Sequence, residues 1–149
     1  MESESRNIYK TARKISGLTQ ERWAEAIGVS PDSVRNYEAG RQLPADEVVI
    51  AMIESSGHHI LGYQHLLSQS RVAADQLPAV VKLPLPQAVI QLLCAINDFA
   101  GDHASLLRIA ADGKIDLDER RAWAKIAADL DSVIRAALQV KFSEGGGES

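Results

Sequence analysis

A cluster of hydrogen-bonding side chains follows Ser30, within a stretch that the sequence predicts to be a short helix. The exposed face of that helix is led by Pro31, Asp32, Ser33, Arg35 and Asn36. A helix of this size fits the major groove of DNA, where base edges present hydrogen-bond donors and acceptors. The chemistry that these residue types predict is recognition of a base sequence.

The distribution of charge points to the same segment. From Arg6 to Arg41 seven basic residues stand against four acidic ones, so this stretch carries a charge of +3. The whole chain of 149 residues carries −4, which by itself argues against a nucleic-acid binder. Because phosphates attract cations, any DNA-facing surface is expected within this segment.

Two short helices must position the polar face. Thr19 is expected to cap a helix over 20–27, and Ser30 to cap the next helix, with Pro31 at its first position. Gly28 lies in the turn between them, and two short helices joined by a turn of this kind can cross at a steep angle.

The packing between these helices is also predicted. Ala24 is small enough to allow a close approach. The angle between the helices is filled by apolar side chains, namely Ile27, Val29, Val34 and Tyr37. A helix over 6–16, ended by Gly17, is expected to precede them.

The segment from Thr19 to Pro44 contains the pattern T-Q-x-x-x-A-x-x-x-G-V-S, followed by Y-E-x-G-R-x-x-P. This pattern resembles the helix-turn-helix family of phage repressors, Cro proteins and xenobiotic-response-element (XRE-type) regulators. The resemblance covers about residues 6–68. Trp23 departs from it, because the family usually has leucine or a similar aliphatic residue there, and this implies a different core with the same fold.

The resemblance implies a five-helix, lambda-repressor-like DNA-binding domain over residues 6–70. Gln20 and Arg41 would then contact backbone phosphates. Arg35 could reach guanine, and Asn36 could reach adenine or a phosphate. The implied groove-facing positions are Pro31, Asp32, Ser33, Arg35 and Asn36.

The resemblance also implies an internal pair. Arg13 and Glu38 match residues that, in this family, join the first helix to the end of the third. Arg13 is therefore expected to be structural rather than to face DNA.

Two residues of the predicted recognition helix depart from the common pattern. Pro31 offers no donor, and Asp32 repels phosphate although it can accept from cytosine. We therefore expect few direct base contacts. The alternative is a helix-turn-helix scaffold that serves as a protein-interaction module, such as an antitoxin-like or anti-repressor partner.

The remainder of the chain is predicted to be all-α. Further helices are expected over 45–55, 59–70, 87–99, 101–111 and 117–142. Residues 71–86 are interpreted as a proline-containing linker, residues 87–142 as a helical oligomerisation region, and residues 143–149 as a flexible tail. Asp116 and Glu119 are expected to form a capping box at the start of the last helix.

The second half shows apolar residues at steps of three and four, a pattern that makes a seam for another helix. The residues assigned to this oligomerisation seam are Val89, Leu92, Ile96, Phe99, Trp123, Ile126, Leu130, Val133 and Ala137. A homodimer is expected, with a tetramer as the alternative, because two copies can read two half-sites of DNA. This half also resembles, more weakly, the C-terminal part of prophage CII-like regulators.

Other sites are not supported by the sequence. The acids Asp112, Asp116 and Asp118 fail the calcium-loop pattern, and the histidines lack zinc spacing, so no metal is expected. No motif of an enzyme or of a cofactor site is found. Cys94 is expected to be buried.

The compartment and the partners follow from these features. No apolar run reaches the length of a membrane span, and the first residues are too polar for a signal peptide, so a cytoplasmic protein is expected. The expected partners are double-stranded DNA and a second copy of the chain, with RNA polymerase or a regulatory protein as a further partner. Repression by occupying a promoter is the default mechanism.

Overall fold

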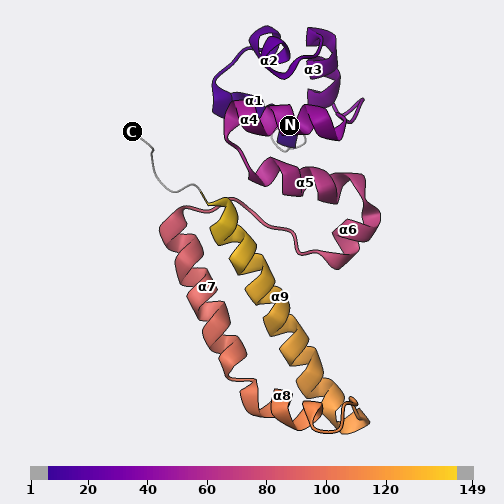
Figure 1. The fold of residues 1–149 in the computed structure, drawn as a ribbon, viewed down its shortest axis with the longest axis vertical. Helices are drawn as coiled ribbons and strands as arrows, with labels where there is room; N and C mark the ends of the chain where they lie inside the picture. The colour runs from indigo at the N-terminus through magenta and orange to yellow at the C-terminus, as the bar shows by residue number, and fades with distance from the viewer. Residues whose placement is uncertain (1–6, 144–149) are drawn as a thin grey trace. The chain divides into compact units, whose positions relative to one another are not determined.

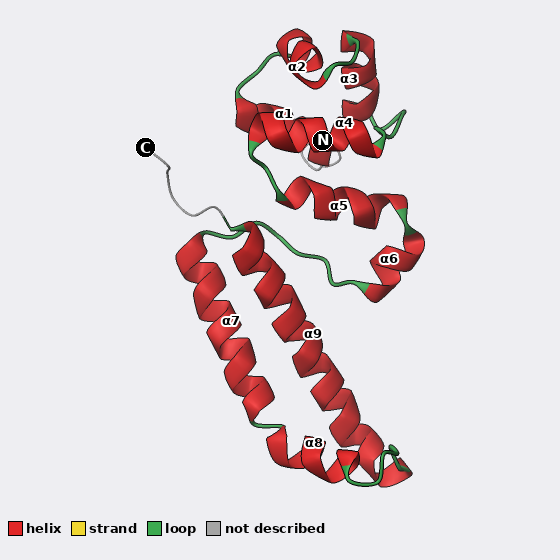
Figure 2. Ribbon diagram, viewed as in Figure 1, coloured by secondary structure: helices red, strands yellow, loops and turns green. Residues whose placement is uncertain are grey.

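The computed structural model describes residues 7–143, and these form helices and loops without a strand (Figures 1 and 2). The chain divides into two compact units, Met1–Leu77 and Pro78–Ser149. The all-α prediction is confirmed. The predicted tail lies, apart from Ser143, outside the described residues.

The first unit contains six helices within its described residues. They are α1 (Ile8–Ser16), α2 (Gln20–Ile27), α3 (Pro31–Glu38), α4 (Asp46–Ser56), α5 (Ile60–Gln69) and α6 (Arg71–Gln76). Each of the first five helices supplies at least one residue to a single apolar core. Trp23 is 1% exposed in this core, so it fills the position where the resemblance implies an aliphatic residue.

The stretch expected to be a linker differs in part from the prediction. Its first residues form the short helix α6, because the Ser70 side chain accepts from the Ala73 amide and caps the helix. Its last two residues, Leu85 and Pro86, begin α7. An extended connection remains between these two helices, over residues 77–84.

The second unit is a helical hairpin with a short connecting helix. Its elements are α7 (Leu85–Ala100), α8 (His103–Ala110), the 3₁₀ turn η2 (Leu117–Glu119) and α9 (Arg120–Phe142). Figure 1 shows α7 and α9 side by side and antiparallel, with α8 at the end of the pair where α7 ends and α9 begins. The capping box predicted at Asp116 and Glu119 is present, and it precedes the 3₁₀ turn.

The interior of this hairpin is made largely of small residues. Ala88, Ala95 and Ala136 are buried along the α7–α9 pair, together with Ile126. Cys94 is exposed, which corrects the expectation that it is buried, because the direction from α7 to α9 passes through its neighbour Ala95 instead. Within residues 7–143, no helix is both long enough and apolar enough to cross a membrane.

Candidate nucleic-acid interface

The turn between α2 and α3 is fixed by its caps and by one glycine. The Thr19 hydroxyl accepts from the Arg22 amide, and the Ser30 hydroxyl accepts from the Ser33 amide at 3.1 Å. Gly28 has φ of 75°, which an L side chain adopts only with strain, and Pro31 lies at the start of α3. The caps predicted at Thr19 and Ser30 are confirmed.

The packing between α2 and α3 holds the second helix at a fixed angle. Ala24 is 1% exposed, and its small side chain lets the helices approach closely. Ile27, Val34 and Tyr37 are buried in the same core. The outer face of α3 is thereby presented to solvent on a rigid support.

Glu38, at the end of α3, accepts hydrogen bonds from two other elements. Arg13 of α1 donates to it through Nε and Nη2, and the Arg13 Nη1 donates to the Leu18 carbonyl at 2.9 Å. Gln20 of α2 donates its amide Nε2 to Glu38 Oε2 at 2.8 Å. The Glu38 side chain is only 6% exposed. The predicted Arg13–Glu38 pair is confirmed, and it ties α1, α2 and α3 together.

Gln20 is therefore engaged within the protein. Its amide nitrogen belongs to the Glu38 cluster, while its carbonyl oxygen accepts no bond among the described residues. A phosphate at the start of α2 would meet the unpaired backbone N–H groups of that helix terminus. Gln20 places this terminus relative to α3 through its bond to Glu38.

The predicted groove-facing residues lie together on α3. Pro31, Asp32 and Arg35 are exposed, whereas Ser33 and Asn36 are partly buried. The Ser33 hydroxyl lies 2.9 Å from the Ser30 hydroxyl, so it supports the cap as well as the outer face. The structure thus brings the five residues to one helix.

Arg35 is paired with two carboxylates. Its Nη1 donates to Asp32 one turn earlier at 2.5 Å, and its Nη2 donates to Glu21 of α2 at 3.3 Å. All three side chains remain open to water, with Arg35 47% exposed. Exposed pairs of this kind contribute little to stability, so Arg35 can exchange these partners for a ligand.

Arg41 lies in the loop after α3. Its guanidinium Nη1 lies 3.5 Å from the Asn36 Oδ1 atom, and both side chains belong to the same edge of the helix-turn-helix segment. Arg41 is exposed. A cation at this loop suits a contact to the phosphate backbone, which needs charge but no base-specific geometry.

Two residues of this region were not found from the sequence. Asn7 caps α1 by accepting from the Tyr9 and Lys10 amides, and its Nδ2 donates to the Tyr37 carbonyl at 2.9 Å. Glu21 pairs with Arg35 across the turn. An Asn before a helix signals the cap, but no linear spacing signals a contact between two helices that cross.

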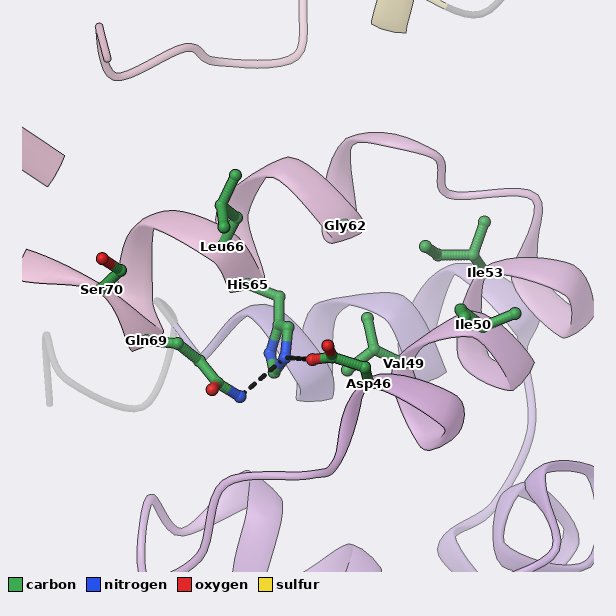
Figure 3. Close-up of a pocket in the computed structure, with 9 residues that line it drawn as sticks. All are labelled: Asp46, Val49, Ile50, Ile53, Gly62, His65, Leu66, Gln69 and Ser70. Atoms are coloured by element: carbon green, nitrogen blue, oxygen red, sulfur yellow. Dashed lines mark hydrogen bonds and ion pairs between the residues drawn. The ribbon is translucent and has the colours of Figure 1, made fainter. Parts of the chain in front are cut away.

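A groove between α4 and α5 lies apart from this polar face in the same unit. Its volume is about 500 Å³, and Figure 3 shows His65 with Asp46 and Gln69 at one end. His65 Nε2 lies 3.2 Å from Asp46 Oδ1 and 2.7 Å from Gln69 Nε2. The other ring nitrogen, Nδ1, lies 2.8 Å from the hydroxyl of Tyr9.

This imidazole is a structural junction. Burial raises the pKa of the Tyr9 hydroxyl, although a hydrogen bond to Ser68 opposes the change, so Tyr9 stays protonated and can donate. Both nitrogens of His65 have protein partners on α1, α4 and α5. The network locks these three helices together beneath the α2–α3 pair.

The comparisons with known proteins concern the first unit. A model of the helix-turn-helix family matches residues 10–55, which is less than a third of the chain and covers α2, α3 and most of α1 and α4. No curated protein and no solved structure gives a match. The family match supports a DNA-binding, regulatory kind of function for the segment that carries the polar face.

Proposed function

We propose that this protein is a sequence-specific DNA-binding transcription regulator, of the kind that represses phage or prophage genes. It binds a two-fold symmetric operator as a homodimer, with α3 in the major groove. The observation that carries this proposal is the rigid α2–α3 pair, which presents Asp32, Arg35 and Asn36 on an exposed helix face. The family match over residues 10–55 supports the same function.

The proposed docking assigns different work to different side chains. Arg35 leaves Asp32 and Glu21 to donate to a guanine edge in the groove. Asn36 contacts adenine or a phosphate, and Arg41 contacts the phosphate backbone. The N-terminus of α2, positioned by Gln20, faces a phosphate through its backbone N–H groups.

The acidic partners of Arg35 set a condition on binding. In free protein Asp32 and Glu21 neutralise the guanidinium, and on DNA they would lie near phosphates. Only a base that accepts two hydrogen bonds from Arg35 compensates for the lost pairs. The arrangement therefore favours discrimination between sequences over tight non-specific binding.

The test is a salt titration of binding to duplex DNA, followed by fluorescence anisotropy. We expect Arg41→Ala to weaken binding and to reduce the slope of log K against log salt by about 1, the value for one lost phosphate contact. Arg135→Ala, which removes another exposed positive charge, on α9, is the matched control and should leave the slope unchanged. Equal effects of the two substitutions would contradict the proposed interface.

One observation favours the second candidate, a protein-interaction module. Arg35 and Gln20 both already have partners within the domain, as expected of a scaffold whose outer face no longer contacts DNA. In that case Arg41→Ala would change neither the affinity for duplex DNA nor the slope of log K against log salt. The partner would then be an antitoxin-like or anti-repressor protein docked on α3.

A further inference from the structure

The hairpin of α7 and α9 has two unlike flanks. At 100° per residue, the side chains that face across the α7–α9 pair are those near Ala88 and Ala95 on α7 and near Ile126 and Ala136 on α9. From about a quarter turn to nearly half a turn from this seam, in the direction of increasing residue angle, each helix carries a second apolar stripe. These stripes comprise Val89, Leu93 and Ile96 on α7, and Trp123, Leu130 and Ile134 on α9.

The two stripes lie on one face of the hairpin. In antiparallel helices, positions displaced in the same rotational sense from the shared seam turn to the same side. Five of the six stripe residues are exposed, among them Leu93 at 60%, Ile96 at 46% and Ile134 at 45%, whereas Leu130 is partly buried at the edge of the stripe. The other flank carries Gln91 and Asp98 on α7 and Arg121, Lys125 and Arg135 on α9. The exposed Cys94 also lies on this flank, and Ile90, which is 62% exposed, lies on the side of α7 that is turned away from the seam.

In a hairpin that is stable by itself, large apolar side chains are expected in the seam between the helices and smaller or polar ones at the surface. Here the distribution of side-chain size is the reverse. Small alanines occupy much of the internal seam, while larger aliphatic residues and Trp123 are left at the surface. An apolar face of this kind, rimmed by polar residues, marks an interaction site. A two-helix hairpin gains most of its burial only when such a face is covered.

We propose that the stripe face is covered by the same face of a second copy of this chain, which closes a four-helix bundle. The six stripe residues carry no charge, and Lys141, which is in line with Trp123 on the last turn of α9, lies at the end of the face, so the apolar parts of two copies meet without like-charge repulsion across a two-fold axis. Because the two flanks of the hairpin differ in polarity, the apolar flank is the one expected to pair with a second copy. The inference rests on the proposed function, since an operator with two half-sites requires two copies.

The dimensions agree with a stable dimer. The 16 residues of α7 span about 24 Å, and two adjacent helices are about 20 Å wide. The flat projected area of the stripe face is therefore roughly 480 Å². A standard interface takes about 800 Å² of accessible surface from each partner. Accessible surface follows the contours of the side chains, so it is larger than the flat projected area of the same face. Four helices packed in this way form a common bundle around apolar seams.

This surface revises the interface expected from sequence. Ile126 is 1% exposed, so it packs within its own chain and offers nothing to a partner. Leu92, Phe99 and Val133 are only partly exposed and lie nearer the internal seam. Ile134, which the sequence places at the edge of the apolar stripe of the last helix, and Leu93, which the predicted set omits, take their place on the outer face.

The experiment is sedimentation equilibrium of the full chain without DNA, from 1 to 100 µM in about 150 mM salt. We expect a mass of twice 16.2 kDa for the wild type, and at least 30-fold weaker dimerisation for Leu93→Glu and for Ile134→Glu. The matched control is Leu107→Glu on α8, where the side chain is 61% exposed, and dimerisation should change less than twofold. Far-UV circular dichroism establishes that each variant is helical.

A second measurement needs no variant. Trp123 lies on the stripe face and is 37% exposed, whereas Trp23 is buried in the other unit. Dilution of the wild type should therefore shift tryptophan emission to the red over the concentration range in which the mass falls. A monomeric wild type at 100 µM, or a dimer that survives both substitutions, would overturn the inference.

The outcomes separate this inference from the proposed function. A dimer with the expected variant pattern that selects no DNA motif leaves the interface standing and removes the operator-binding role. A monomer that still selects a DNA motif removes the interface and leaves DNA recognition standing.

Discussion

At the scale of single residues, the central feature is the contrast between two arginines. Arg13 is 15% exposed and bound to a buried carboxylate, so it holds the domain together. Arg35 is 47% exposed and bound to two exposed carboxylates, so it can change partners at little cost. Burial separates the structural arginine from the one proposed to read DNA.

The first prediction concerns Arg35. We expect Arg35→Ala to relax base preference at one position of each half-site, with roughly a tenfold loss of discrimination, because one bidentate contact distinguishes bases by about 1–3 kcal/mol. The measurement is competition binding between the preferred site and single-base variants. Unchanged preference at every position would show that the recognition helix is docked incorrectly.

The second prediction concerns Arg13. Arg13→Met leaves the buried Glu38 carboxylate without its cation, so the free energy of unfolding should fall by about 3 kcal/mol in urea denaturation. Arg22→Met is the control, because the Arg22–Glu25 pair is 75% exposed on both sides and should change stability by less than about 0.5 kcal/mol. Equal effects would mean that Glu38 is not the junction described.

The double variant Arg13→Met with Glu38→Leu refines this prediction. It removes both charges, so part of the lost stability should return. Gln20 loses its acceptor in the same variant, which limits the recovery. A double variant less stable than Arg13→Met alone would assign the main role to the Gln20 bond.

At the scale of elements, the helix-turn-helix segment could be predicted almost completely from the sequence. Both ends of α2 and the start of α3 follow from Thr19, Gly28, Ser30 and Pro31. Caps and turn residues fix the ends of helices within a few positions of themselves, so the linear sequence is enough to place them. The Arg13–Glu38 pair followed from a family resemblance. Local signals and a known pattern were sufficient there.

Other features could not be predicted, for physical reasons. The pairing of Arg35 with Glu21 depends on the crossing of two helices, which linear spacing does not reveal. The burial expected for Cys94 was wrong, because a wide apolar stripe does not say which of its sides faces the partner helix. Helix α6 was missed because a serine cap in a proline-containing stretch is a weak signal.

The third prediction concerns the turn. Gly28→Ala places a side chain at φ of 75°, and the added Cβ meets no atom within 4 Å, so the cost comes from the backbone alone. We expect a loss of about 1–2 kcal/mol in the free energy of unfolding. Thermal or urea denaturation measures it, and an unchanged or increased stability would contradict the left-handed turn.

The fourth prediction concerns the junction of α8 and α9. The hydrogen bonds that Lys125 donates to Asp102 and Asp129 raise the pKa of Lys125, and the bond from Lys125 lowers the pKa of Asp129 below its ordinary 3.8. Because the folded pKa of Asp129 is depressed, its stabilisation is present above pH 3.8 and is lost as the pH falls through the folded value. The raised pKa of Lys125 keeps the lysine charged throughout this range, so the pH dependence of the pair comes from Asp129.

Lys125→Gln should therefore lower the melting temperature at pH 7. The difference from the wild type should narrow below about pH 4, as Asp129 loses its charge in the wild type too. Thermal melts at a series of pH values, read by circular dichroism, give the comparison. A difference that is constant down to pH 2 would show that the lysine contributes through packing of its aliphatic stem.

At the scale of the whole molecule, the two units divide the work. The first unit presents a polar recognition helix on a locked five-helix core, and the second presents an apolar face on a hairpin whose own seam is thin. Recognition of a short half-site by one small helix gives modest affinity. In the proposed dimer, pairing of two chains through the hairpin would combine two such contacts in one complex and raise the affinity for a symmetric site.

The most direct test of this account is selection of binding sites from random duplex DNA at physiological salt, with the full chain. The account predicts recovery of a two-fold symmetric sequence whose half-sites are centred about 34 Å apart, one turn of the double helix. Recovery of no motif from a folded, helical protein would contradict it, and the polar face of α3 would then belong to a protein partner.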